Sequence, residues 1–159
     1  MSSVLVRAAR GSDAPVVAAF LAARWGAIVV TRCTVHRLSS LPVLVAERRG
    51  IFAGCLTYRT DGQHALEVVT IDAANPRQGV GTALLQAIRA KANRIWLVTT
   101  NDNLAARALY DSVGMKLVAV YRGAVADSRR LKPSIPLVGE NGVPIEDELV
   151  YEWSGENAV

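Results

Sequence analysis

The hydrophobic and polar positions of the chain follow two periods, one typical of strands and one typical of helices. Short apolar runs bounded by turn residues predict strands at residues 4–9, 41–47, 51–59, 65–71, 94–100, 115–122 and 147–153. Two of the connections are short and rich in turn residues. These are Arg48-Arg49-Gly50 and Asp61-Gly62, and they predict antiparallel hairpins in the first half of the chain.

Three segments carry helical spacing instead. The first begins near the capping pair Ser12-Asp13, passes Pro15 in an early turn and ends near Gly26. The other two are residues 79–92 and 103–113, and the second of these is followed by a glycine suited to a left-handed helix cap. Early hairpins followed by a β-α-β-α-β order predict a mixed α/β fold.

Two segments have no decisive pattern. Residues 28–37 are compatible with a loop, a strand or a short helix, and these alternatives stay open. Residues 127–144 contain three prolines and two glycines, which predict a long loop.

Composition places the chain among folded proteins of one domain, here residues 1–159. Hydrophobic residues make up 51% and charged residues 20% of the 159, a balance that excludes a wholly disordered chain. No uncharged apolar stretch reaches the roughly 18 residues that a membrane span needs, and the first residues lack an apolar signal core. We therefore expect a cytoplasmic protein without a membrane partner.

Charge is distributed unevenly, and the distribution bears on the partner. All 18 Lys and Arg residues precede residue 140, whereas 6 of the 14 acids lie in residues 140–159. A basic body fits either nucleic acid or a phosphate-rich cofactor. Because no run of five or more bases occurs and the bases are not interleaved with aromatic residues, we expect no nucleic acid. Cys33 and Cys55 stand outside any metal-ligand cluster or acyl-cysteine motif, so no metal is expected.

The strongest chemical motif lies between the predicted strand 65–71 and the helix that follows it. Residues 75–82 read Asn-Pro-Arg-Gln-Gly-Val-Gly-Thr, and the two glycines expose backbone N–H groups at the positive end of a helix. Such a loop fits phosphate or pyrophosphate, although an ordinary turn into a helix has the same pattern. A Walker loop is excluded because no Lys precedes Thr82, and a Rossmann fingerprint is excluded because Leu84 occupies the third glycine position.

A second motif follows on the later helix. Its residues are spaced as N-x-x-A-x-x-x-Y-x-x-x-G and are Asn103, Ala106, Tyr110 and Gly114. Together with the glycine loop, this order resembles the GCN5-related N-acetyltransferase (GNAT) superfamily, from residue 4 to about residue 121 and most densely over 65–115. The resemblance implies an α/β fold of the GNAT type, with a mixed, largely antiparallel and twisted central sheet, flanking helices and two splayed central strands.

The resemblance also implies an activity and a cofactor. It implies transfer of acetyl from acetyl-CoA to a primary amine by direct attack, with a small molecule or a protein amine as acceptor. The pyrophosphate would meet the loop amides, and the pantetheine arm the end of the preceding strand. The residues so assigned are Val69, Thr70, Ile71, Gln78, Gly79, Val80, Gly81 and Thr82, with Asn103 and Ala106 from the later helix. The first loop position of the family, usually Arg or Gln, is Pro76 here, and Arg77 is expected to take its place.

Two side chains are candidates for catalysis. Tyr110 matches the family tyrosine that protonates the departing thiolate, although a core tyrosine would also fit. Glu67 interrupts an apolar strand, where an acid is costly unless it is exposed or used, and a glutamate on this strand is the general base in several members of the superfamily. A solvated carboxylate stays an alternative, because strand faces alternate. His64 and Asp72 are weaker candidates, and nothing in the sequence places His36 near the acyl group.

The acceptor is expected to bind between residues 24–37 and 127–146. Trp25 is a candidate pocket wall, and Arg129, Arg130 and Lys132 are candidates to recognise a carboxylate or phosphate on the acceptor. A core tryptophan and a solvated basic loop are the alternatives. The resemblance is compatible with a homodimer. The alternative to an enzyme is a non-catalytic acyl-CoA-binding or sensing module of the same fold.

Overall fold

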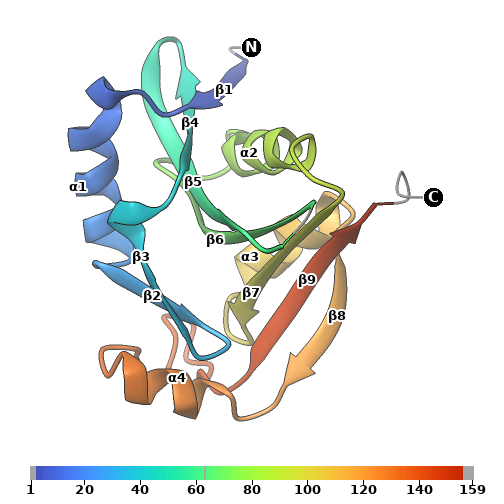
Figure 1. Cartoon of the computed structure of the whole chain (residues 1–159). Helices are drawn as coiled ribbons and strands as arrows, with labels where there is room; N and C mark the ends of the chain where they lie inside the picture. The colour runs from blue at the N-terminus through green and yellow to red at the C-terminus, as the bar shows by residue number, and fades with distance from the viewer. Residues whose placement is uncertain (1–2, 63, 156–159) are drawn as a thin grey trace.

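One mixed sheet forms the centre of the molecule (Figure 1). The structure is a computed structural model that describes residues 3–62 and 64–155. Seven strands pair side by side in the order β1 (Val4–Ala8), β4 (Val43–Arg48), β5 (Ile51–Thr60), β6 (Ala65–Ala73), β7 (Arg94–Thr100), β9 (Glu148–Ser154) and β8 (Lys116–Tyr121). Every neighbouring pair is antiparallel except β6 and β7, which run parallel.

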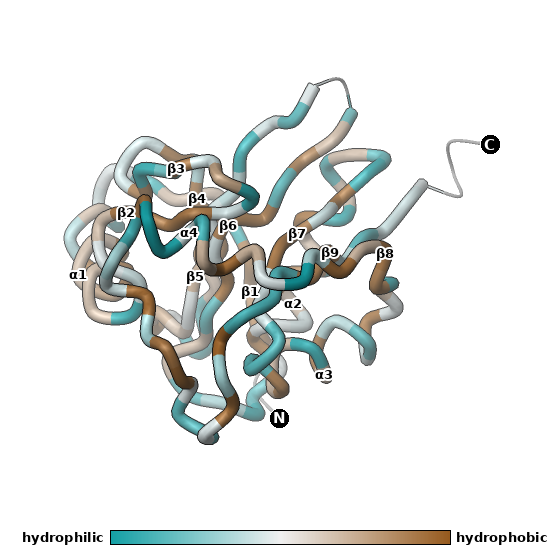
Figure 2. The backbone as a smooth tube through the Cα atoms, turned by 90° about the horizontal axis from the view of Figure 1, so that it is seen from below, coloured by the Kyte–Doolittle hydropathy of each residue, from teal (hydrophilic) through white to brown (hydrophobic). Residues whose placement is uncertain are grey.

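Helices and a separate hairpin cover the two faces of this sheet. Helices α2 (Val80–Arg89) and α3 (Leu104–Ser112) contribute to the larger core cluster, which they share with strands β4 to β7 and β9. Helix α1 (Ala14–Arg24) and the hairpin of β2 (Ile28–Thr31) and β3 (Thr34–Arg37) contribute to a second cluster. Figure 2 shows the most hydrophobic stretches along the strands that lie between these layers. The central strands of the sheet are thus covered on both faces, whereas the edge strand β8 stays mostly exposed.

The two parallel strands separate half-way along their length. Residues Ala65–Val68 of β6 pair with Arg94–Leu97 of β7, and the pairing ends there. Beyond that point the last residues of β7 continue to pair with β9. On its other side β6 carries a β-bulge, because Val69 has no partner between the pairs that β5 makes with its two neighbours. We call the place where β6 and β7 part the fork, and it confirms the splayed central strands expected from the resemblance.

The structure decides the segment that sequence pattern left open. Residues 28–37 form the β2–β3 hairpin, whose turn places Arg32 and Cys33 at positive φ. Such a turn is compatible with the twist of the two strands it joins.

The expectation of a long loop over residues 127–144 is wrong in its first part. Helix α4 (Val125–Leu131) occupies this stretch and ends before Pro133. Its sequence, VADSRRL, contains no helix breaker, and the prolines that predicted a loop begin only after it. The remainder is irregular apart from one bridge between Val138 and Pro144.

Candidate functional site

The glycine loop joins the end of β6 to α2. Gly79 is the N-cap of α2 at φ +77°, and Arg77 also lies at positive φ, so the chain turns sharply just before the helix. No side chain caps this end of α2, and residues 75–79 are exposed. Because the first N–H groups of a helix have no intrahelical partner, the amides of Val80, Gly81 and Thr82 remain available to an anion.

Gly81 has a second reason to be small. A Cβ atom at this position would lie 2.8 Å from Cδ2 of Leu109 on α3. The second glycine of the motif therefore also permits close packing of α2 against α3.

Tyr110 lies on α3 inside the larger core cluster. The residue is 5% exposed, and its ring centroid is 5.3 Å from that of Tyr151 on β9. Burial raises the pKa of its phenol, and the nearby Asp72 carboxylate adds to the effect. Within the described residues its hydroxyl makes no hydrogen bond with another side chain or with the backbone. The phenol therefore stays protonated, and it donates no hydrogen bond within the described residues.

Asn103 and Ala106 begin the same helix. Asn103 is the N-cap of α3, and its side-chain oxygen accepts a hydrogen bond from the backbone N–H of Ala106 at 3.4 Å. This capping contact gives Asn103 a structural role. Contact with a cofactor stays a prediction for both residues.

Glu67 is fully buried directly beside the fork. Its residue pairs with Trp96, one position before the last parallel pair, and none of its surface is exposed. Oε1 accepts a hydrogen bond from Nε of Arg59 at 2.6 Å, and Oε2 accepts one from Oγ1 of Thr31 at 2.8 Å. Burial raises the pKa of the Glu67 carboxyl, and the hydrogen bonds from Thr31 and Arg59 oppose that effect. The solvated alternative is therefore wrong, because Thr31 and Arg59 hold this carboxyl in the interior.

His36 belongs to the same buried group, although the sequence gave no reason to place it there. Its Nε2 lies 2.6 Å from Oγ1 of Thr31 and 3.8 Å from Oε1 of Glu67. Burial lowers the pKa of the imidazole, and the charge of Arg59 lowers it further. The pairing of Val29 with His36 in the hairpin puts the ring on the face that meets the sheet. Recognition of residues 28–37 as a hairpin would have revealed this placement.

Glu148 is a second buried carboxylate that the sequence analysis did not identify. Glu148, 3% exposed at the start of β9, accepts hydrogen bonds from Nη1 of Arg32 at 3.0 Å and from Oγ of Ser128 at 3.0 Å. The Arg32 guanidinium also stacks 3.4 Å above the ring of Tyr121. Because Thr31 binds Glu67 and its neighbour Arg32 binds Glu148, the hairpin tip connects a strand on each side of the fork.

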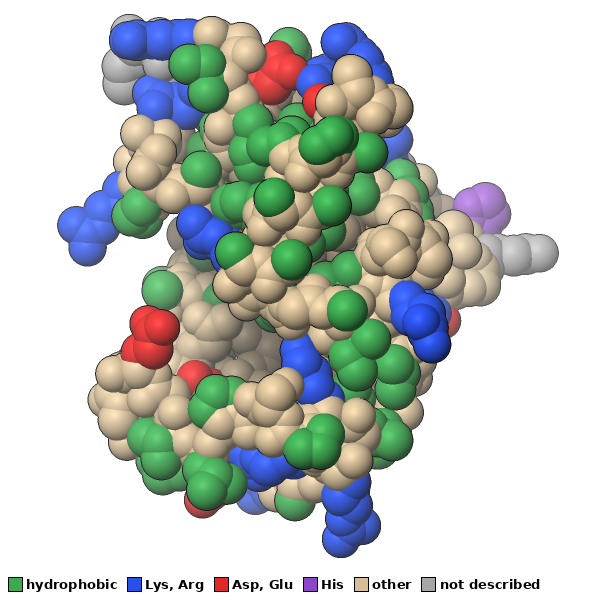
Figure 3. All heavy atoms as spheres, turned by 90° about the vertical axis from the view of Figure 1, so that its left-hand side faces the viewer, with side chains coloured by type: hydrophobic (Ala, Val, Ile, Leu, Met, Phe, Trp, Pro, Cys, Tyr) green, Lys and Arg blue, Asp and Glu red, His purple; other side chains and the backbone are tan. Residues whose placement is uncertain are grey.

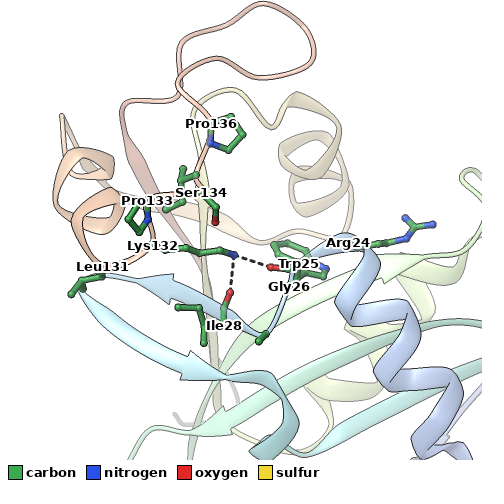
Figure 4. A pocket seen from close by; sticks show the side chains of 11 residues that line it. Arg24, Trp25, Gly26, Ile28, Leu131, Lys132, Pro133, Ser134 and Pro136 are labelled. Atoms are coloured by element: carbon green, nitrogen blue, oxygen red, sulfur yellow. Dashed lines mark hydrogen bonds between the residues drawn. The ribbon is translucent and has the colours of Figure 1, made fainter.

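A pocket of about 630 Å³ opens on the side of the sheet that carries α1 and the hairpin (Figure 4). Its wall is formed by residues 24–28 at the end of α1 and by residues 131–136. Nζ of Lys132 donates hydrogen bonds to the backbone oxygens of Trp25 at 2.8 Å and Ile28 at 2.7 Å, and these bonds tie the two walls together. Burial lowers the pKa of Lys132. Figure 3 shows the surface hollowed below α1, between that helix and the lower part of the molecule.

The structure separates the other residues expected to bind the acceptor. The Trp25 indole N–H is buried without a partner among the described residues, beside the pocket. The Arg129 guanidinium donates to the backbone oxygens of Ile135, Pro136 and Ile145, so it braces the irregular segment instead of facing solvent. The Arg130 side chain is 82% exposed and lies 3.5 Å from Asp127.

The weaker base candidates lie apart from Glu67. Asp72 pairs with Arg24 at 3.0 Å, and His64 is exposed in the turn before β6. Over residues 3–62 and 64–155, no three His, Cys, Asp or Glu side chains are grouped to hold a metal ion. In the same residues no helix is long and apolar enough to cross a membrane.

The chain belongs to the GNAT family of acetyltransferases. Residues 19–115 match the model of that family, described as "Acetyltransferase (GNAT) family". The chain is also 40% identical over 139 residues to the uncharacterized protein YdhI of Bacillus subtilis (strain 168), an alignment covering 83% of this chain and 86% of YdhI. The family expected from the sequence is thereby confirmed.

Solved structures show the same fold. An IAA acetyltransferase from Bacillus cereus ATCC 14579 matches with a TM-score of 0.71 at 18% identity, over 94% of this chain and 98% of its own. A GNAT family acetyltransferase from Elizabethkingia anophelis with acetyl-CoA bound matches with a TM-score of 0.66 at 14% identity, over 95% and 97% of the two chains. The mixed sheet flanked by helices is therefore the GNAT fold.

Proposed function

We propose that this chain, as one domain, transfers an acetyl group from acetyl-CoA to a primary amine by direct attack. The observation that carries the proposal is the fork, because an acid and a base lie on opposite faces of the sheet beside it. Tyr110 belongs to the core cluster of α2 and α3, whereas Glu67 is bound from the hairpin side by Thr31. An acceptor and a cofactor that approach from opposite faces would each lie on the side of the sheet that holds the group its chemistry needs.

Acetyl-CoA fits the face and the loop that carry α2. Its pyrophosphate would bind the free amides at the start of α2, helped by Gln78 and by Arg77, which replaces the usual first loop side chain. Its pantetheine amides would pair with Val69 to Ile71, where β6 has lost β7 as a partner. The acetyl-CoA held by the Elizabethkingia anophelis structure supports this assignment.

The chemistry needs two proton transfers. The amine nitrogen forms a bond to the acetyl carbonyl carbon, and the carbon–sulfur bond breaks. Tyr110 donates its proton to the departing thiolate, and Glu67 receives the proton that the amine loses. A buried carboxyl with a raised pKa is suited to hold that proton near neutral pH.

The acceptor is proposed to bind in the pocket between residues 24–28 and 131–136. The apolar walls favour a ligand with an apolar body. Arg130 at the rim would add attraction for an anionic group. Arg129 and Lys132 act through the shape of the pocket, because backbone oxygens occupy their donors.

A screen of primary amines tests this proposal. The purified protein is mixed with acetyl-CoA and with small amines or peptides, and released thiol and acetylated product are measured. We expect thiol release that depends on one class of amine. Binding of acetyl-CoA without release for any amine would favour the non-catalytic acyl-CoA module, and absence of binding by calorimetry would contradict both.

A further inference from the structure

The buried carboxyl of Glu67 cannot meet an amine directly. The residue has no exposed surface, and Arg59 and Thr31 each occupy one of its oxygens. The hydrogen-bonded partners of Glu67 are therefore the routes within the structure by which a proton can reach it. Arg59 is unsuited because a guanidinium stays protonated in proteins, which leaves the hydroxyl of Thr31.

Hydrogen-bond counting fixes the direction of each bond in this group. A hydroxyl has one proton, and an ionised carboxylate can only accept, so Thr31 donates to Oε2 of Glu67. Oγ1 of Thr31 must then accept from His36, which requires the proton of the imidazole to lie on Nε2. Nδ1 of a neutral His36 is consequently bare, and it has no hydrogen-bond partner among the described residues.

We propose that His36 and Thr31 form a relay through which Glu67 takes the proton of the acceptor amine. The inference rests on the proposed function. The amine proton binds Nδ1 of His36, the Nε2 proton moves to Oγ1 of Thr31, and the original hydroxyl proton moves to Oε2 of Glu67. The step ends with a neutral amine, a neutral Glu67 and a neutral His36 protonated on Nδ1, so protons and charge balance.

The position of the hairpin supports this route. His36 lies one layer below the surface, since its neighbours Val35 and Arg37 are exposed while its own ring is buried against the sheet. The residue paired with Arg37 is Ile28, which lines the pocket proposed for the acceptor. The pocket and the relay therefore share the same hairpin.

The charges that face the relay come from four elements. Arg59 of β5 contacts Glu67 and is itself 3.7 Å from Asp61. On the other side of Thr31, Arg32 of the hairpin turn pairs with Glu148 of β9. Glu67 is the carboxylate that the relay can protonate, because Oγ1 of Thr31 donates its hydrogen bond to Oε2 of Glu67.

A spectroscopic experiment tests the relay without an acceptor. The sequence has two histidines, so ¹⁵N-labelled histidine gives two ring systems, and His64→Gln identifies the one that belongs to His36. We expect neutral His36 with its proton on Nε2 at pH 7, and loss of that preference in Thr31→Val. A proton on Nδ1 alone, or on both nitrogens, at pH 7 in the parent protein would overturn the relay.

A kinetic experiment separates a relay from a structural contact. In His36→Gln the side-chain amide can still donate to Thr31 but cannot pass a proton onward. We expect kcat to fall about 100-fold, with KM for acetyl-CoA and the thermal midpoint nearly unchanged. Thr31→Val should show a similar loss and Thr31→Ser should restore much of it, while His64→Gln serves as the matched control with parent kinetics.

The pH profile gives the decisive outcome. Nδ1 must be bare to accept a proton, so kcat of the parent should rise with pH through a pKa that lies below the ordinary value of a histidine. His36→Gln should lose this limb. An active parent with an equally active His36→Gln would overturn the relay alone, whereas a parent that acetylates no amine would overturn the proposed function.

Discussion

The hydroxyl of Tyr110 and the carboxyl of Glu67 lie on different faces of one sheet, and burial changes the acidity of both. Burial of each group disfavours its charged form, so the pKa of both the phenol and the carboxyl is raised. A phenol that stays protonated can donate to a thiolate, and a carboxylate with a raised pKa accepts a proton more readily. Burial thus keeps the proton on the phenol and strengthens the carboxylate as a proton acceptor, which fits the acid and base roles proposed for the two residues.

Removal of the Tyr110 hydroxyl tests the proposed role of Tyr110 as the general acid. Tyr110→Phe keeps the ring that packs on Tyr151 and deletes only the donor, so we expect near-parent stability and a kcat lower by roughly 10²–10⁴-fold. Tyr151→Phe is the matched control, because its hydroxyl accepts from Arg107 and lies outside the proposed chemistry. An unchanged kcat for Tyr110→Phe, where the chemical step limits the rate, would remove Tyr110 from the mechanism.

At this scale the sequence indicated candidate positions but not their partners. Glu67 attracted attention because an acid in an apolar strand needs a reason, and that reasoning depends only on its neighbours in the chain. Its partner Thr31 lies 36 residues away, in a segment whose structure the pattern left open. His36 could not be assigned for the same reason, because a hydrogen bond to Thr31 requires the hairpin to exist first.

The packing of α2 against α3 shows how two motifs depend on each other. Gly81 of the loop motif lies where α3 would meet any larger side chain, and the contact is Leu109, one residue before Tyr110. The glycine therefore serves the helix pair as well as the proposed pyrophosphate site.

A double variant separates these two roles. Gly81→Val should lower the free energy of unfolding by about 1–3 kcal/mol, because the added side chain overlaps Leu109. Adding Leu109→Ala should relieve the overlap and recover part of that stability. If the amides at the start of α2 hold the pyrophosphate, calorimetry should show that the double variant binds CoA more weakly than the parent protein does, because the valine still hinders the approach of the pyrophosphate. Parent-like CoA binding in the recovered double variant would place the site elsewhere.

The segment after β8 shows how an element can be misjudged from composition. Its prolines and glycines predicted a loop, but α4 occupies the part before them. Arg129 and Lys132, expected to face an acceptor, instead donate to backbone oxygens: Arg129 to the irregular segment, and Lys132 to the end of α1 and the start of β2. The sequence pattern does not show which backbone oxygens lie within reach of these two side chains.

Across the whole molecule, one ion-pair group fastens the N-terminal strand and the start of α1 to the sheet. The Arg7 guanidinium of β1 binds Asp13 through two hydrogen bonds of 2.7 and 2.9 Å and also binds Glu47 of β4. The hydrogen bonds from Arg7 and from the backbone N–H of Arg10 hold the pKa of the Asp13 carboxyl well below its usual range.

This arrangement predicts how stability depends on pH. Asp13 is ionised in the folded state at pH values where it is already protonated in the unfolded state, so its contribution is present above about pH 4 and is lost as the pH falls further. Urea unfolding should therefore show Asp13→Asn less stable than the parent at pH 7, with a smaller difference at pH 3. The exposed Asp127→Asn is the control. A difference that stays constant between the two pH values would contradict the prediction.

The sequence by itself determined most of the strands and helices, the glycine loop and the family, but not the β2–β3 hairpin or α4. The elements that it determined depend mainly on the pattern of neighbouring residues. The cytoplasmic location and a homodimer stay predictions. Only the tertiary structure decided what the site contains. The fork depends on where two strands stop pairing. The hydrogen bonds to Glu67 and Glu148 depend on the tip of the β2–β3 hairpin, which contacts residues 36 and 116 positions away in the chain. Burial and hydrogen bonding act between atoms in space, and the order of residues does not specify which distant atoms meet.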